Sequence, residues 1–224
     1  MTTWNIIPSP PATAAENMAI DWQMFNDTEA GLIGPSVRVY TWSEPGVTYG
    51  YLQEEESINA VIASEAKQSH TCHTDSSDER LLRFARNDIS DAVSVPNPAK
   101  RPTGGGIVFH DTEEVAYCLA APNNGEYLPP RLTDAYLMVS RIICQARREL
   151  GYHVELKNTG QGPGLRKNSR MLCFSNGEAH EIMLGEKKVV GSAQRRTNKT
   201  ILQQGTVKVG ILIEESCHAE LVEV

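Results

Sequence analysis

The chain has 224 residues, of which 40% are hydrophobic and 22% are charged, so it is long enough to bury one sizeable core. We expect a single domain over residues 1–224, because two full domains of this combined length would be cramped. The net charge of −7 argues against a nucleic-acid-binding protein, since such proteins usually present a basic surface.

The charge is unevenly distributed along the chain. Residues 161–210 contain nine Lys or Arg and three Asp or Glu, a net charge of +6, so the remainder carries −13. This division predicts a basic face that binds an acidic partner.

The cysteines and the apolar residues indicate the cellular setting. Five cysteines are scattered without a Cys-x-x-Cys pair, which favours a reduced intracellular protein over a disulfide scaffold. The first residues do not have the pattern of a signal peptide, and no apolar run reaches about eighteen residues. We therefore expect a cytoplasmic protein that does not associate with a membrane.

The N-terminal third predicts one helix and two strands. Thr13 and Glu16 have the spacing of a capping box, and apolar residues recur at helical spacing after them. Residues 37–42 alternate as a strand does, and the turn at Pro45 and Gly46 leads into a second strand that ends near Tyr51. We expect these two strands to pair as a hairpin.

Residues 61–91 differ in composition from the rest of the chain: polar residues replace core-forming ones, and the hydrophobic residues follow neither a helical nor a strand period. Parts of this segment, like residues 214–224, look like translated interspersed repeat DNA, so we interpret 61–91 as an insertion and 214–224 as a repeat-derived tail. His70, Cys72 and His73 do not complete a tetrahedral set of ligands, and no metal site is predicted.

The remaining chain predicts strands with one further helix. Residues 107–121 have the pattern of a strand, a turn and a strand, and Thr133 is the expected cap of a helix that ends at Gly151. A candidate strand at 154–156 and a Gly-rich loop at 157–170 follow. Three apolar stretches come next, at 180–184, 188–193 and 206–213. Together these elements predict an α/β fold of the α+β type, in which helices pack on a mixed, largely antiparallel sheet.

The segment from Arg101 to Asp111 is the most distinctive motif. Gly104, Gly105 and Gly106 lead into a strand, and three glycines allow backbone amides to approach an anion or a carbonyl group closely. A bare glycine triplet is more often a flexible turn. The motif is neither a Walker loop nor a dinucleotide fingerprint, because it has no Gly-Lys-Ser/Thr and no helix follows it.

Two further residues could take part in acyl chemistry. Lys188 opens a strand that runs into small residues, and a buried lysine there could stabilise developing negative charge, although a solvated lysine fits the same pattern. Cys173 follows three basic residues, and neighbouring cations lower the pKa of a thiol. An isolated cysteine is also compatible with a packing role.

These segments, in this order, resemble the lipoate/octanoate protein ligase and transferase family, which has the biotin/lipoate ligase catalytic-domain fold. The resemblance is carried mainly by Thr103-Gly-Gly-Gly-Ile-Val-Phe-His-Asp111 together with Lys188-Val-Val-Gly-Ser-Ala-Gln194, and it spans about residues 4–210 outside the expected insertion. The Cys173-Phe174 pair before the lysine is similar to the cysteine-dependent octanoyltransferase branch.

The resemblance implies an acyltransferase of protein lipoylation. Cys173 would take an octanoyl or lipoyl group from acyl carrier protein as a thioester, a lysine of a lipoyl domain would receive it, and Lys188 would stabilise the oxyanion. The implied acyl-binding residues are Arg101, Thr103, Gly104, Gly105, Gly106, His110, Gly191, Ser192 and Ala193. The implied partners are acyl carrier protein and the lipoyl domains of 2-oxo acid dehydrogenases or the glycine cleavage H protein.

Two alternatives remain open at this point. An ATP-dependent lipoate-protein ligase would use the same glycine loop and Lys188 to hold a lipoyl-adenylate, with free lipoate, ATP and Mg as its requirements, whereas the transferase needs no cofactor. The second alternative is an inactive remnant that only binds carrier domains, since relatives usually continue beyond this point with helices that cover the sheet.

Overall fold

The computed structural model of the chain describes residues 3–56, 58, 97–157, 181–185 and 187–208. The expected insertion at 61–91, residues 158–170 of the expected loop and the expected tail at 214–224 lie outside these residues. In chain order, the helices and strands are β1 (Asn5–Ile6), α1 (Ala14–Glu29), β2 (Ser36–Thr41), β3 (Gly46–Tyr49), β4 (Ala99–Lys100), β5 (Val108–His110), β6 (Glu114–Pro122), α4 (Leu132–Glu149), β7 (Glu155–Lys157), β8 (Glu181–Leu184), β9 (Lys187–Arg196) and β10 (Thr200–Lys208).

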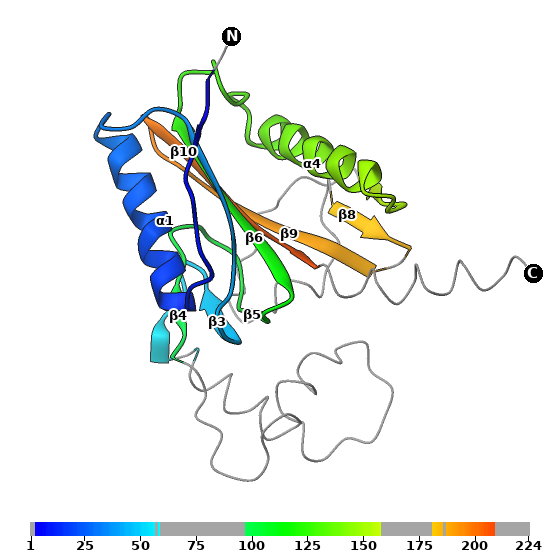
Figure 1. Cartoon of the computed structure of the whole chain (residues 1–224). Helices are drawn as coiled ribbons and strands as arrows, with labels where there is room; N and C mark the ends of the chain where they lie inside the picture. The colour runs from blue at the N-terminus through cyan, green and yellow to red at the C-terminus, as the bar shows by residue number, and fades with distance from the viewer. Residues whose placement is uncertain (1–2, 57, 59–96, 158–180, 186, 209–224) are drawn as a thin grey trace, which may run out of the picture.

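The strands form two sheets (Figure 1). The larger sheet has seven strands in the order β1-β2-β6-β10-β9-β8-β7, and all its pairings are antiparallel except β1 with β2. The smaller sheet has the order β4-β3-β5, with β3 parallel to β4 and antiparallel to β5. The predicted mixed, largely antiparallel sheet packed with helices is confirmed.

The predicted hairpin between the strands at 37–42 and 46–51 is wrong. β2 pairs along its whole length with β6, where Val37 lies opposite Leu119, while β3 crosses to the smaller sheet and places Thr48 opposite Val108. The physical reason is the long strand β6, which is buried on both faces and needs a hydrogen-bonding neighbour on each edge. A local turn between β2 and β3 could not satisfy that strand.

Helix α1 begins where the capping residues predicted. The Thr13 hydroxyl accepts a hydrogen bond from the Glu16 amide, and the Glu16 carboxylate accepts one from the Thr13 amide. The helix packs Met18 and Phe25 against one face of the large sheet, which presents Ala116 and Leu202 among other buried residues. This face of the sheet contains the candidate site.

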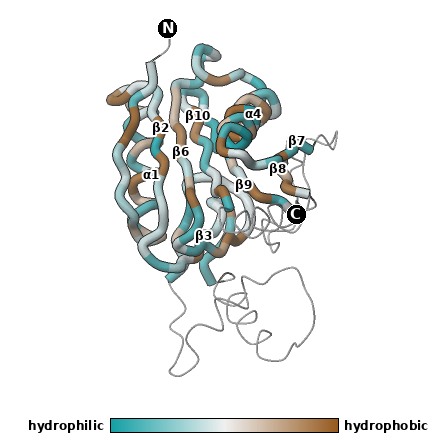
Figure 2. The backbone as a smooth tube through the Cα atoms, turned by 45° about the vertical axis from the view of Figure 1, so that its right-hand side comes forward, coloured by the Kyte–Doolittle hydropathy of each residue, from teal (hydrophilic) through white to brown (hydrophobic). Residues whose placement is uncertain are grey.

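Helix α4 covers the opposite face of the large sheet (Figure 2). Its Ala135 and Val139 pack against a cluster that includes Leu119 and Ile201. The prediction that Thr133 caps this helix is wrong: the N-cap is Arg131, which makes no side-chain capping bond. The two prolines that precede Arg131 hold the chain extended up to the helix start, so a side-chain cap is not needed to stop it there.

Candidate active site

A cavity of about 40 Å³ lies between α1, the centre of the large sheet and the small sheet. Its apolar wall includes Met18, Trp42, Val108 and Ala116, which come from four different segments of the chain. Polar groups face the same space, including Arg101, Thr103, His110 and residues 191–193. Six of the predicted acyl-binding residues therefore line one cavity, with the glycine loop at residues 104–106 directly beside them.

The glycine loop is held in shape by Arg101. This buried guanidinium donates hydrogen bonds from Nη2 to the carbonyl oxygens of Gly104 (3.2 Å) and Gly106 (2.5 Å). Gly105 adopts a positive φ of 97°, a conformation that favours glycine. Gly50 must also be glycine, because a Cβ there would overlap the carbonyl oxygen of Gly105. The triplet is therefore a structured loop and not merely a flexible turn.

A buried hydrogen-bond relay connects this loop to the end of the cavity. Arg101 Nη1 donates to Thr48 Oγ1 at 2.8 Å, and Thr48 Oγ1 lies 2.8 Å from His110 Nε2. His110 Nδ1 lies 3.1 Å from a carboxylate oxygen of Glu114, and that oxygen also accepts a bond from Thr206 Oγ1 at 3.0 Å. The relay fixes the imidazole ring between a hydroxyl and a carboxylate.

The indole of Trp42 completes this end of the cavity. Its ring stacks on His110 with 4.0 Å between ring centroids and 25° between the ring planes. Trp42 is 3% exposed, and its Nε1 has no hydrogen-bond partner within the part of the chain that the structure describes. A buried donor without a partner costs free energy, so this group is suited to meet a polar atom that enters the cavity.

A second buried network supports the other side of the loop. Thr103 Oγ1 donates to Gln204 Oε1 at 2.7 Å, and Gln204 Nε2 donates to the carboxylate of Asp21. The other Asp21 oxygen lies 2.7 Å from Arg38 Nη1, and both of these side chains are fully buried. Burial raises the pKa of Asp21, while the Arg38 charge and the donated hydrogen bonds oppose that shift.

Strand β9 forms the floor of the cavity. Gly191, Ser192 and Ala193 line it, and Ser192 Oγ lies 2.7 Å from the Tyr117 hydroxyl. Lys188 lies three residues before Gly191 on the same strand and is half-buried. It is not among the described residues that line this cavity, so its predicted contact with the acyl carbonyl group stays a prediction.

Cys173, the predicted nucleophile, lies outside the described residues. Two other cysteines are described, and both are buried: Cys118 under α1 and Cys144 on α4. Burial raises the pKa of each of these thiols, which disfavours the reactive thiolate. Neither Cys118 nor Cys144 is therefore suited to replace Cys173 as a nucleophile.

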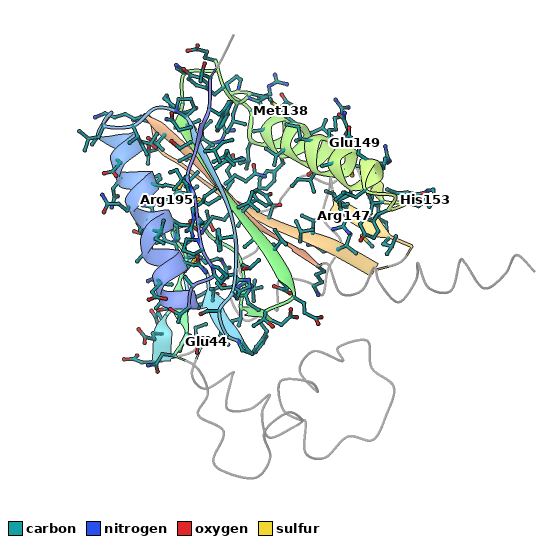
Figure 3. All side chains as sticks on the ribbon, viewed as in Figure 1. Glu44, Met138, Arg147, Glu149, His153 and Arg195 are labelled. Carbon is teal, nitrogen blue, oxygen red and sulfur yellow. The ribbon has the colours of Figure 1, made fainter. Side chains whose placement is uncertain are left out.

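The described part of the predicted basic face is divided by the sheet. The Arg195 guanidinium lies 4.2 Å from the ring centroid of Tyr51 and donates to the carbonyl oxygen of Pro102, beside the glycine loop and α1 (Figure 3). The next residue, Arg196, instead donates to the carbonyl oxygens of Pro129 and Pro130 before α4. Alternation along a strand sends adjacent side chains to opposite faces, so of these two arginines it is Arg195 that contributes charge at the cavity rim.

Several residues of this site were not predicted as site residues, namely Asp21, Arg38, Trp42, Thr48 and Glu114. Each lies in a helix, strand or turn that the sequence predicted. Sequence patterns did not single them out, because their hydrogen-bond partners or their positions at the cavity depend on how distant segments pack. No cluster of His, Cys, Asp or Glu among the described residues could hold a metal ion. Within the same residues, no helix is both long and apolar enough to cross a membrane.

Comparison with known proteins agrees with this geometry. Residues 96–216 match the model of the lipoyl protein ligase A/B catalytic domain. The octanoyltransferase LipM of Halalkalibacterium halodurans is 30% identical over 94% of this chain and 67% of its own length. The LipM of Moorella thermoacetica is also 30% identical, over 92% of this chain and 64% of its own length. This chain thus spans about two thirds of the length of these relatives.

Solved structures show the same fold at lower identity. A lipoate-protein ligase A bound with ATP is 17% identical with a TM-score of 0.61, over 95% of this chain and 71% of its own. A putative lipoate protein ligase from T. acidophilum with bound lipoic acid is 18% identical with a TM-score of 0.60, over 94% of this chain and 68% of its own. The predicted biotin/lipoate ligase catalytic-domain fold is confirmed.

Proposed function

This chain belongs to the lipoyl protein ligase A/B catalytic-domain family, and from that premise we propose that it is an octanoyltransferase of protein lipoylation. The relatives at about 30% identity that are named octanoyltransferases support the transferase over the ligase alternative. The donor in this proposal is octanoyl-acyl carrier protein, and the acceptor is a lysine of a lipoyl domain in a 2-oxo acid dehydrogenase or the glycine cleavage H protein.

The observation that carries the proposal is the cavity beside the glycine loop. Its wall combines the apolar side chains of Met18, Trp42, Val108 and Ala116, which suits a saturated acyl chain. The small residues 191–193 on β9 line the cavity, and neither they nor the adjacent glycine loop carry a bulky side chain, which suits the polar carbonyl end of that chain. Medium-chain acyl groups have both of these parts.

In the proposed reaction, the thiolate of Cys173 attacks the carbonyl carbon of the octanoyl thioester. A new carbon–sulfur bond forms, the bond to the carrier's sulfur breaks, and the carrier leaves as a thiol after protonation. The amine of the acceptor lysine then attacks the Cys173 thioester, forms an amide and releases the cysteine. The thioester already activates the acyl group, so the transfer does not require ATP or a metal ion.

Lys188 and the rim have supporting roles in this proposal. Lys188 would donate a hydrogen bond to the acyl carbonyl oxygen as negative charge develops there. Arg195, with Lys100 beside the same aromatic ring of Tyr51, gives the rim positive charge next to the loop. Such charges would attract acidic carrier domains and increase the rate of productive encounter.

Intact mass after incubation with octanoyl-acyl carrier protein tests the proposal. We expect an octanoyl increment in the native chain and its loss in Cys173→Ala. Cys144→Ala is the matched control, because it removes a buried thiol on α4 and should keep the increment. Replacement of Lys188 by Ala should abolish transfer to a lipoyl domain while the chain stays folded, as judged by circular dichroism.

Two results would contradict the transferase. If no increment forms and lipoylation of a lipoyl domain instead requires ATP and free lipoate, the chain is a ligase. If the chain binds a lipoyl domain but neither becomes acylated nor transfers an acyl group under either condition, it is a non-catalytic binder.

A further inference from the structure

We propose that Thr48, His110 and Glu114 form a hydrolytic triad in the same cavity, which cleaves medium-chain acyl thioesters to the free acid independently of Cys173. The proposal rests on the proposed function in one respect only, namely that the cavity binds an acyl chain. Its chemistry comes from residues of the described structure and does not involve the cysteine.

The three side chains have the order and spacing of a nucleophile, a base and an orienting acid. Thr48 Oγ1 lies 2.8 Å from His110 Nε2, and His110 Nδ1 lies 3.1 Å from Glu114 Oε2. Thr48 and Glu114 are 0% and 1% exposed, and His110 is 5% exposed, so water does not compete for these bonds from the outer surface. Thr48 and His110 both line the cavity, where a bound thioester would reach them.

The surrounding donors determine the direction of each proton. Arg101 Nη1 has only protons to offer, so Thr48 Oγ1 accepts that bond at 2.8 Å and directs its own proton to His110 Nε2. Thr206 Oγ1 donates to the same Glu114 oxygen that faces His110 Nδ1, so this carboxylate oxygen accepts from both. His110 therefore has its Nδ1 protonated and its Nε2 ready to accept a proton, as a general base requires.

Two donors lie next to members of the triad, at the cavity that they line. The Arg101 guanidinium lies beside Thr48 Oγ1, where it stabilises an alkoxide. The Trp42 indole N–H is buried without a partner among the described residues, in a ring stacked on His110. A donor that is already desolvated and oriented stabilises an oxyanion without reorganisation.

The reaction balances with water as the co-reactant. Thr48 Oγ attacks the thioester carbonyl carbon and its proton moves to His110 Nε2; the carbon–sulfur bond breaks and the leaving thiolate takes that proton. Water then attacks the Thr48 ester carbonyl carbon and gives one proton to His110. The carbon–Oγ bond breaks, the proton returns to Thr48, and the products are a thiol and a fatty acid.

The test uses the full chain with Cys173→Ala and octanoyl-N-acetylcysteamine as the substrate, with thiol release followed colorimetrically. We expect thiol release above the buffer rate, and a fall of about 100-fold when Thr48→Val is added, because that change keeps the side-chain shape and removes the hydroxyl. Thr48→Ser is the matched control, since it keeps the nucleophile and should retain most of the rate.

A trapped intermediate gives a second readout that does not depend on the folding of Thr48→Val. Neutral hydroxylamine cleaves thioesters and leaves oxygen esters intact, so an octanoyl group on Thr48 of the Cys173→Ala chain should survive this treatment and map to the peptide that contains Thr48. Glu114→Gln should reduce thiol release and shift its pH profile, because a neutral amide holds the imidazole less firmly than a carboxylate does.

Two results would overturn the triad. In the first, the Cys173→Ala chain releases thiol no faster than buffer does. In the second, the double variant with Thr48→Val releases thiol as fast as the Cys173→Ala chain. Either result leaves the proposed transferase standing if the native chain still shows its octanoyl increment. If the native chain shows neither an increment nor hydrolysis, both proposals fall.

Discussion

The buried ion pair between Asp21 and Arg38 is connected through Gln204 and Thr103 to the glycine loop. Replacing Arg38 should show how much this pair contributes to the free energy of unfolding. Arg38 and Asp21 are both fully buried, with 2.7 Å between Nη1 and Oδ1. Arg38→Met keeps most of the side-chain volume, removes the charge and leaves the Asp21 carboxylate without its counter-ion. Breaking a buried pair from one side costs about 3–5 kcal/mol of unfolding free energy.

Urea denaturation followed by circular dichroism converts this cost into a midpoint shift. With an m-value of about 2.5 kcal/mol/M for a chain of this size, the midpoint should fall by about 1–2 M. The loss should be smaller at low pH. Without Arg38, burial raises the folded-state pKa of Asp21 above its unfolded value, so the protonated folded form is favoured below that pKa and the penalty grows as the pH rises.

Two controls separate the ion pair from other effects of losing an arginine. Arg196→Met removes a half-buried arginine that donates to the backbone carbonyl oxygens of Pro129 and Pro130 and to Gln194 Oε1, all of them uncharged acceptors, and it should shift the midpoint much less. Adding Asp21→Asn to Arg38→Met removes the uncompensated charge and should recover a large part of the loss. A single variant as stable as the native chain, or a double variant no better than the single one, would refute the reasoning.

Two further predictions concern the loop and helix α1. Gly50→Ala should displace the loop at Gly105 and lower octanoyl transfer by at least about tenfold at a stability cost of about 1–3 kcal/mol, whereas Gly34→Ala, which meets no crowded atom, should leave transfer rates unchanged. The Thr13 hydrogen bonds lower the pKa of Glu16, so their stabilisation of α1 is present above the unfolded pKa of a glutamate and is lost as pH falls through the lowered value. In thermal denaturation at a series of acidic pH values, Glu16→Gln should therefore make the Tm fall less steeply as the pH is lowered. An unchanged dependence of the Tm on pH would count against the capping box.

Local sequence patterns were sufficient for features that depend on neighbours along the chain. Thr13 and Glu16 are three residues apart, and their spacing alone predicted the start of α1. Alternation similarly predicted the strand at β2, an apolar stretch predicted part of β9, and the glycine triplet indicated a loop at residues 104–106. The family motifs selected residues of one cavity, because each motif is a short run held together by the backbone.

Strand pairing was the part of the fold that these patterns did not determine. The turn at Pro45 and Gly46 favoured a hairpin, yet β2 and β3 belong to different sheets. A turn motif predicts the conformation only of its own residues. The pairing of β2 depends instead on the long strand β6, which lies more than seventy residues further along the chain.

The sequence by itself determined the family, the motifs and most of the positions of helices and strands, because each of these depends on short contiguous stretches of residues. Only the tertiary structure decided that Thr48 meets His110 across 62 positions and that Thr103 meets Gln204 across 101 positions. It also placed Arg195 and Arg196 on opposite faces of the sheet. Hydrogen bonds between residues so far apart in the sequence depend on which strands lie side by side and which faces are buried. Both are properties of the packed molecule and not of any single segment.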